Sequence, residues 1–210
     1  MRAALDAGEL RDLEASVAGL PPDQAGIRIH GNAGVRRWLT PPGAIWKFAA
    51  AVLGEICHPV RAILFDKTAS TNWALAWHQD RTIAVTERIE VAGFGPWTVK
   101  SGLLHVAPPF AVLEGMVTLR VHLDAVPATN APLLIAPGSH RLGLIPEPDI
   151  KRVLARCGSA VCLAEAGDIW LYATPILHAS EAAGDPIHRR VLRVDFAVGD
   201  LPGGLKWLGV

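Results

Sequence analysis

The spacing of proline and glycine along this chain limits the folds that it can adopt. Sixteen prolines and twenty glycines are spread over 210 residues and are not gathered into one linker. After residue 60 they stand at nearly every junction between short apolar runs, where each favours a turn for its own conformational reason. Few helices can form between such closely spaced turns. The pattern therefore predicts a mainly β chain of short strands.

The clearest strand signal lies at residues 117–124, where apolar and polar residues alternate. Alternation with a period of two places one set on each face of a strand. The apolar set is Val117, Leu119, Val121 and Leu123, and the polar set is Thr118, Arg120, His122 and Asp124. Further short strands are expected at 60–65, 82–85, 133–135, 160–163, 168–172, 177–180 and 190–198. Many short strands with regular turns favour a jelly-roll or double-stranded β-helix of the cupin-like kind.

Helices are expected only before this strand-rich part. An amphipathic helix is predicted over residues 2–19, ended by Gly19 and Pro21-Pro22, and a second over residues 43–56, stopped by Pro59. Both are expected to pack outside the β-structure. The length suits one domain over residues 1–210, with a helical preface at 1–58 and a β-helix core at 60–200.

Composition narrows the partners and the compartment. Twenty basic and twenty acidic residues cancel, so neither nucleic acid nor a membrane surface is expected as a partner. Neither a secretory signal nor an apolar run of membrane-spanning length is recognisable, which predicts a cytoplasmic protein. The odd number of cysteines, Cys57, Cys157 and Cys162, indicates reduced thiols.

Three residues suggest a metal site. His78 and Asp80 are two residues apart in an extended run, so their side chains can point to the same side. His178 follows an apolar run about a hundred residues later. Two imidazoles and one carboxylate form the facial triad of non-haem Fe(II) oxygenases, which leaves three coordination positions open. The competing interpretation is three unrelated polar residues, which would require three coincidences in one ordered pattern.

The segment from residue 87 to 109 has weak periodicity and contains several glycines and prolines. A loop of this length inside a compact domain is usually functional. Because the segment directly follows the His78 strand, we expect it to lie over the mouth of the barrel and to influence substrate choice.

Four short stretches together resemble a known family. They are His78-Gln79-Asp80, residues 119–133, Pro137-Gly138-Ser139-His140, and residues 177–180 with an arginine eleven residues after His178. In this order and at these distances they resemble the phytanoyl-CoA dioxygenase-like enzymes among the Fe(II)/2-oxoglutarate-dependent oxygenases. The resemblance covers residues 78–196.

The resemblance implies a double-stranded β-helix that holds Fe(II) through His78, Asp80 and His178. It also implies 2-oxoglutarate as the chelating cosubstrate and O2 as the oxidant. Arg189 matches the family arginine that pairs with the far carboxylate of the keto acid, a task suited to a planar guanidinium. Ser180 matches a position that hydrogen-bonds the same carboxylate, and Arg120 occupies a position near the keto acid.

The adjacent arginines Arg189 and Arg190 leave the strand register open. Strand alternation allows only one of them to face the barrel interior. The family register favours Arg189, whereas the pattern alone does not decide.

The expected function is a dioxygenase that hydroxylates a small or medium organic substrate and releases succinate and CO2. The alternatives are a non-catalytic cupin-like metal- or ligand-binding module, or a different metal-dependent enzyme on the same barrel. The arginine after His178 favours the oxygenase, because a plain metal cupin has no need of a carboxylate clamp there. The identity of the substrate and the oligomeric state do not follow from the sequence.

Overall fold

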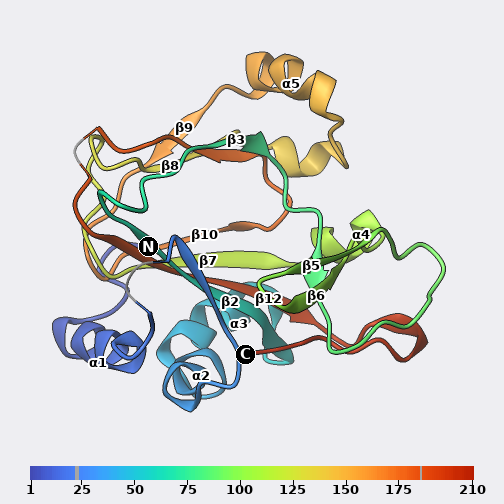
Figure 1. The fold of residues 1–210 in the computed structure, drawn as a ribbon, viewed down its shortest axis with the longest axis horizontal. Coiled ribbons are helices and arrows are strands. Elements are labelled where there is room, and N and C mark those ends of the chain that lie inside the picture. The colour runs from blue at the N-terminus through green and yellow to red at the C-terminus, as the bar shows by residue number, and fades with distance from the viewer. Residues whose placement is uncertain (22–23, 185) are drawn as a thin grey trace.

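Two β-sheets face each other at the centre of the molecule (Figure 1). The computed structural model describes residues 1–21, 24–184 and 186–210. Within these ranges every strand pair is antiparallel. The fold is the predicted mainly β jelly-roll of the double-stranded β-helix type, and the prediction of fold class is confirmed.

The larger sheet has five strands, and helices cover its outer face. Its order is β1 (Gly26–Ile29), β2 (Cys57–Lys67), β12 (Arg189–Val198), β7 (Val117–His122) and β10 (Ile169–Ala173). The covering helices are α1 (Ala7–Val17), α2 (Ala33–Leu39) and α3 (Ala44–Leu53), which lie below the sheet in Figure 1. Their buried residues, including Leu13 and Ile45, join the main hydrophobic core with Leu119 of β7.

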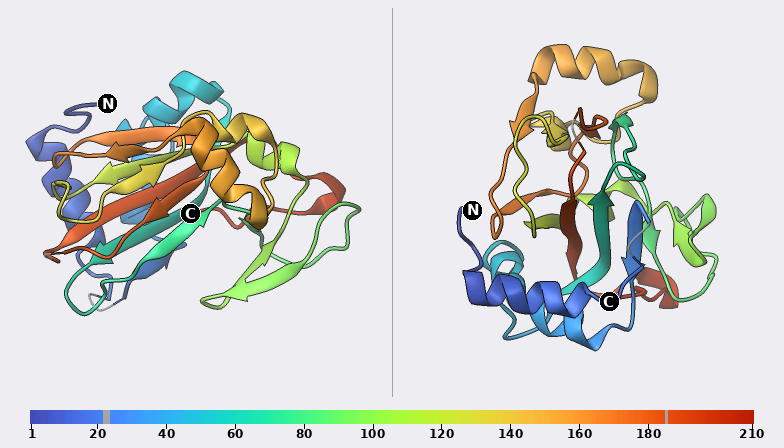
Figure 2. Two further views of the ribbon diagram at one scale, coloured as in Figure 1. Left: turned by 90° about the horizontal axis from the view of Figure 1, so that it is seen from above. Right: turned by 60° about the vertical axis from the view of Figure 1, so that its left-hand side comes forward.

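The facing sheet has four shorter strands, β3 (Leu75–His78), β11 (His178–Ser180), β8 (Leu133–Ile135) and β9 (Ala160–Cys162). Helix α5 (Ile150–Cys157) and the short turns η1 (Ser139–Leu142) and η2 (Glu147–Asp149) lie on its outer side, at the top of the right-hand view in Figure 2. Trp77 of β3 packs into the cluster formed with these elements. Because neighbouring strand residues point to opposite faces, His78 is left facing the space between the sheets.

A third sheet lies to one side. It consists of β4 (Ile83–Ala84), β6 (Leu103–Val106) and β5 (Trp97–Lys100), and α4 (Phe110–Glu114) and η3 (Pro202–Gly204) lie near it. The segment 87–109, expected as a loop, thus contains a β-hairpin. Val106 and Phe94 pack against Val60 and the C-terminal residues, so most of the segment lies beside the barrel. Of this segment, only Lys100 at the hairpin tip is part of the wall of the central cavity.

Strand β12 shows how the two faces of the large sheet differ. Leu192, Val194 and Phe196 point toward the helices and are fully buried there. Arg189 and Arg193 point into the space between the sheets. The outer face of β12 thus packs against the helices through these apolar side chains, whereas its inner face carries the buried Arg189 and Arg193.

The helical preface differs from its prediction. Residues 26–29 form strand β1, which pairs with β2 and extends the large sheet, and residues 33–39 form helix α2. The first helix ends at Val17 and the predicted 43–56 helix spans Ala44–Leu53. Pro22, part of the predicted stop signal, lies outside the described residues. No helix among the described residues combines the length and the apolar character that crossing a membrane requires.

We predict that Phe196→Ala destabilises the protein strongly. Phe196 is fully buried between the large sheet and the helices, so truncation removes apolar contact and leaves a cavity. The expected loss is about 3–5 kcal/mol of unfolding free energy, measured by urea denaturation. Val198→Ala, at the exposed end of the same strand, is the control and should change stability by about 0.5 kcal/mol or less. Equal losses in both variants would contradict the placement of the core.

Candidate active site

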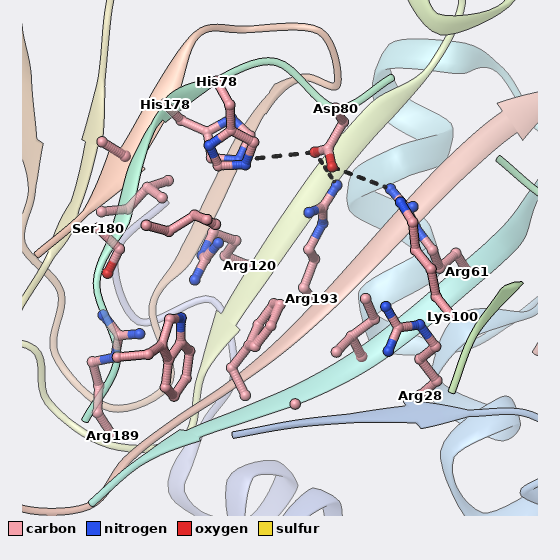
Figure 3. Close-up of a pocket in the computed structure, with 17 residues that line it drawn as sticks. Arg28, Arg61, His78, Asp80, Lys100, Arg120, His178, Ser180, Arg189 and Arg193 are labelled. Atoms are coloured by element: carbon pink, nitrogen blue, oxygen red, sulfur yellow. Dashed lines mark hydrogen bonds and ion pairs between the residues drawn. The ribbon is translucent and has the colours of Figure 1, made fainter. Parts of the chain in front are cut away.

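A cavity of about 200 Å³ lies between the two large sheets. Its wall includes His78, Asp80 and His178 and a set of basic side chains (Figure 3). Five of the six predicted site residues come from strands of the facing sheets or their ends, and Asp80 follows β3 by two residues. The structure brings all six, including Arg120, Ser180 and Arg189, to this one cavity.

His78 and His178 are cross-strand neighbours. They are paired in the register between β3 and β11, and their ring centroids are 4.3 Å apart. Nδ1 of His78 lies 2.7 Å from the carbonyl oxygen of Ala76, and Nδ1 of His178 lies 2.9 Å from that of Ile176. A carbonyl oxygen only accepts hydrogen bonds, so Nδ1 of each ring must carry the proton. The Nε2 lone pairs are therefore available, which is the tautomer that binds a metal.

The charge state of His178 agrees with this tautomer. Burial lowers the pKa of His178 to about 4, and Asp80 offsets only part of the effect. His78 and Arg193 lower the pKa of His178 further. The ring is therefore neutral at pH 7, as a metal ligand must be.

Asp80 lies beside the two rings and is held by arginines. Its Oδ2 is 3.9 Å from Nε2 of His178 and accepts a 2.5 Å hydrogen bond from Arg193, while Oδ1 is 3.8 Å from Arg61. Burial raises the pKa of Asp80, but Arg193 and Arg61 together hold it below its ordinary value. Asp80 is therefore a carboxylate at neutral pH.

The three groups are close in pairs, yet they do not form a closed metal site. Among the described residues, no three His, Cys, Asp or Glu side chains are arranged tightly enough to hold an ion as they stand. Oδ2 of Asp80 is hydrogen-bonded to Arg193. The donor set itself, two imidazole nitrogens and one carboxylate, is the set that suits Fe(II).

A buried polar network fixes the arginines under Asp80. Asp195, which is fully buried, accepts hydrogen bonds from Arg193 at 3.1 Å, from Arg61 at 2.5 Å and from the hydroxyl of Thr118 at 2.8 Å. Both guanidinium groups are thus held from below with Nη2 beside Asp80, at 3.8 Å for Arg61 and 2.5 Å for Arg193.

Gln79 anchors the backbone between His78 and Asp80. Its amide donates to the carbonyls of Gly143 and Pro175 at 3.1 and 2.8 Å, and its carbonyl accepts from the backbone N–H of Ile145 at 2.7 Å. The side chain is buried. The end of β3 is thereby tied to the loop before β11 and to the segment before η2.

Basic groups gather at one end of the cavity and form no ion pairs with the residues that the structure describes. Arg189 is almost fully buried and donates to the carbonyl of Ala131. Lys67, also fully buried, donates to the hydroxyl of Ser180 at 3.0 Å. Nε of Arg189 and Nε of Arg120 are buried and have no hydrogen-bond partner among the described residues. Burial and the charge of Arg120 lower the pKa of Arg189, and the charge of Asp66 offsets only part of this effect.

Arg190 faces the other way. It donates to Asp124 at 2.6 Å and to Glu14 of α1 at 2.7 Å. This pair of contacts links helix α1 to the outer face of the large sheet. The structure thus places Arg189 in the cavity and Arg190 outside it, while the role of Arg189 toward a keto acid stays a prediction.

Sequence reasoning missed several residues of the cavity wall. Arg28 belongs to β1, a strand that was not predicted, and Lys100 belongs to a hairpin that was expected as a loop. Arg61 and Arg193 also line the cavity. Alternation could have indicated Arg193, since it lies four residues beyond Arg189 on the same strand face.

Comparison with known families gives a clear match. The family model described as phytanoyl-CoA dioxygenase (PhyH) matches residues 22–191. The chain belongs to the phytanoyl-CoA dioxygenase family. The resemblance stated from the sequence is thereby confirmed. No curated protein matches this chain.

Solved structures of similar fold include SnoN, HygX and EctD. The epimerase SnoN from nogalamycin biosynthesis, described as alpha-ketoglutarate dependent, is 19% identical with a TM-score of 0.67, covering 97% of this chain and 84% of its own. HygX from Streptomyces hygroscopicus, solved with nickel and 2-oxoglutarate, is 13% identical with a TM-score of 0.63, covering 94% and 81%. EctD from S. alaskensis is 19% identical with a TM-score of 0.61, covering 96% and 70%. At these identities the likeness shows the fold alone.

The cofactors predicted from the resemblance agree with these findings. Fe(II), 2-oxoglutarate and O2 are the cofactors of the phytanoyl-CoA dioxygenase family. A second HygX structure holds iron, and a second SnoN structure holds Fe3+, alpha ketoglutarate and a nogalamycin compound. A further HygX structure holds hygromycin B. Both HygX and SnoN thus bind small organic molecules.

We predict that Gln79→Ala weakens both the fold and the site. Loss of the side chain leaves buried backbone groups such as the N–H of Ile145 unpaired, at a cost of roughly 1–3 kcal/mol. Urea denaturation measures this loss, and Fe(II) affinity should fall with it because His78 and Asp80 flank the anchor. Gln24→Ala, at an exposed position, is the control. Unchanged stability of Gln79→Ala would show that the anchor is dispensable.

Proposed function

We propose that this protein is an Fe(II)- and 2-oxoglutarate-dependent dioxygenase that hydroxylates a small or medium organic substrate with release of succinate and CO2. The observation that carries the proposal is the juxtaposition of two kinds of group in one cavity. His78 and His178 present free Nε2 atoms beside the carboxylate of Asp80, and buried cations without ion pairs lie at one end. Family membership supports the same reaction class.

In this proposal His78, Asp80 and His178 hold the iron. The rings are prepared by their Nδ1 hydrogen bonds to backbone carbonyls, so neither must change tautomer. Asp80 must share its carboxylate between the metal and Arg193, which already binds Oδ2. When bound, iron with 2-oxoglutarate supplies the activation of O2 that oxidises the substrate while the keto acid loses CO2.

Arg189 and Arg120 are proposed to bind the far carboxylate of 2-oxoglutarate, with Ser180 beside it. The guanidinium of Arg189 has an unpartnered Nε directed into a buried environment, and an Arg–carboxylate pair forms two parallel hydrogen bonds. The hydroxyl of Ser180 is oriented by Lys67. Lys67, whose pKa burial lowers to about 8, adds positive charge behind Ser180 but does not itself line the cavity.

A non-catalytic metal- or ligand-binding barrel explains these cations less well. A barrel that holds only a metal has no need to bury Arg189 and Lys67 beside Arg120 without carboxylate partners, because each buried cation carries a desolvation cost. A dianionic keto acid offsets this cost. An assay of succinate formation and product mass separates hydroxylation from the epimerase chemistry named for SnoN.

We predict that Asp80→Ala abolishes the iron–keto acid chelate. Wild-type protein titrated anaerobically with Fe(II) and 2-oxoglutarate should develop the weak visible charge-transfer band of the chelate, and the variant should not. Succinate formation should be lost as well. Asp200→Ala, which removes an exposed carboxylate elsewhere, should behave as wild type. A full band in Asp80→Ala would disprove the role of this carboxylate.

We predict that Arg189→Ala weakens 2-oxoglutarate binding by roughly one to two orders of magnitude, from a charged hydrogen-bond contribution of about 1.5–3 kcal/mol. The dissociation constant from anaerobic titration is the measurement. Arg190→Ala is the matched control on the opposite face: its keto-acid affinity should stay unchanged, and its stability should fall by about 1 kcal/mol through loss of the Glu14 and Asp124 pairs. A large affinity loss in Arg190→Ala alone would reverse the assignment.

A further inference from the structure

The cavity has a second basic end, away from Arg189. Arg28 of β1, Arg61 of β2 and Lys100 at the tip of the β5–β6 hairpin gather there, as Figure 3 shows. Asp80 and Arg193 lie between the two ends in this view. The three residues come from separate parts of the chain and meet only because β1 and β2 pair and the hairpin folds back toward them.

Charge in the cavity wall is strongly unbalanced. Among the described residues that line it, six carry guanidinium or ammonium groups and Asp80 is the one carboxylate. Asp195 lies beneath the wall and is bound to Arg193 and Arg61. Neither Arg28 nor Lys100 forms an ion pair with any described residue.

The hydrogen bonds of these two side chains are to neutral groups. Arg28 donates from Nη1 to the hydroxyl of Ser101 at 2.8 Å, and Lys100 donates to the hydroxyl of Thr82 at 2.9 Å. Nε of Arg28 is buried and has no partner among the described residues. Both groups are therefore held in place by neutral partners and keep donor capacity for an anion.

Neighbouring positive charge destabilises the charged forms of both Arg28 and Lys100. Burial and then Arg61 lower the pKa of Arg28. Burial and Arg61 likewise lower the pKa of Lys100, and Asp80 offsets only part of this effect. A site that keeps like charges together in this way gains free energy when an anion binds between them.

Iron and 2-oxoglutarate do not remove this excess. Their charges, two positive and two negative, cancel when both are bound, and the keto acid's far carboxylate is assigned to the Arg189 end. The Arg28 end therefore remains positive in the loaded enzyme. The substrate is the remaining molecule that the reaction brings into the cavity.

Part of the wall between the ends is apolar. Ile63 and Phe65 follow Arg61 at every second position of β2, so all three face the cavity, and Leu75 of β3 lies in the opposite wall. An organic chain or ring can pack there while a charged group reaches Arg28. The cavity of about 200 Å³ limits the part inside it to a small molecule.

We propose that Arg28 and Lys100 bind an anionic oxygen group, a carboxylate or a phosphate, on the substrate, whose apolar part lies against Ile63 and Phe65. This inference rests on the proposed function and names the substrate class of the same site. It also refines the expected role of residues 87–109, because selection is assigned to Lys100 at the hairpin tip and not to the whole segment.

The test uses the protein loaded anaerobically with Fe(II) and 2-oxoglutarate. Calorimetric titrations measure the affinities of 3-phenylpropionate and of its neutral analogue 3-phenylpropanamide, two ligands of similar shape and different charge. A titration with inorganic phosphate tests whether the site also binds a phosphate group. Wild type should bind 3-phenylpropionate at least tenfold more tightly than the amide. Arg28→Gln and Lys100→Gln should each remove roughly tenfold of this preference, consistent with one charged hydrogen bond.

Two further variants separate charge from structure. Arg28→Lys, which keeps the positive charge, should stay within a few fold of wild type. Arg36→Gln removes an exposed arginine from α2, on the far side of the large sheet, and should leave both affinities unchanged. Competition of inorganic phosphate with 3-phenylpropionate, weakened by Arg28→Gln, would support one shared anion site and would extend it to phosphate esters.

Failure of this inference is distinct from failure of the proposed function. If wild type shows a normal chelate band but binds 3-phenylpropionate and 3-phenylpropanamide equally well, the anion site is overturned and the oxygenase proposal stands. The anion site is also overturned if Arg28→Gln loses affinity for 2-oxoglutarate and keeps its affinity for 3-phenylpropionate. In that case the keto acid, and not the substrate, would occupy the Arg28 end of the cavity. Absence of the chelate band contradicts the oxygenase, and the same titrations of metal-free protein then decide the anion site alone.

Discussion

The ion pair between Asp80 and Arg193 is the contact on which the arrangement of the site depends. Arg193 reaches Asp80 because Asp195 holds it from below, and Thr118 holds Asp195 in turn. A buried charge is tolerated only when it is paired and hydrogen-bonded. The series of hydrogen bonds from Thr118 through Asp195 and Arg193 to Asp80 satisfies this condition across two strands of the large sheet. It holds the Asp80 carboxylate beside His178 of the other sheet.

At the two ends of the cavity, charged groups lack such partners among the described residues. Arg189 and Arg120 at one end, and Arg28 and Lys100 at the other, keep donors or charge that the described chain does not balance. Such groups lower stability when nothing is bound, and they gain free energy when an anion arrives. Proteins commonly carry this kind of conflict at functional sites. The polar side chains on the inner sheet faces are thus suited to ligand binding. The helices stabilise the fold by apolar packing on the outer face of the large sheet.

Much of the fold was accessible from local pattern. The alternation at 117–124 and the short apolar runs after residue 130 correspond to β7 to β12, because strand periodicity and turn residues act over a few neighbours. The elements of the preface, residues 1–58, were harder to predict from local pattern. Strand β1 has only four residues and is stabilised by pairing with β2, a long-range contact. The β5–β6 hairpin was hidden by its glycines and prolines, and its packing against Val60 depends on residues far away in the chain.

The sequence by itself determined the order and spacing of His78, Asp80, His178 and the arginine that follows. Residue types and intervals can be read directly from the chain, so this pattern suffices to indicate a family and a set of metal-binding groups. Tertiary structure decided which groups share the cavity. Pairing of β12 with β2 and β7 directs Arg189 inward and Arg190 toward Glu14, since the helices cover the apolar face of that strand. Arg28 and Lys100 meet only after β1 joins the sheet and the hairpin closes on it. Such proximity is created by hydrogen-bonded strand pairing and not by neighbours in the chain.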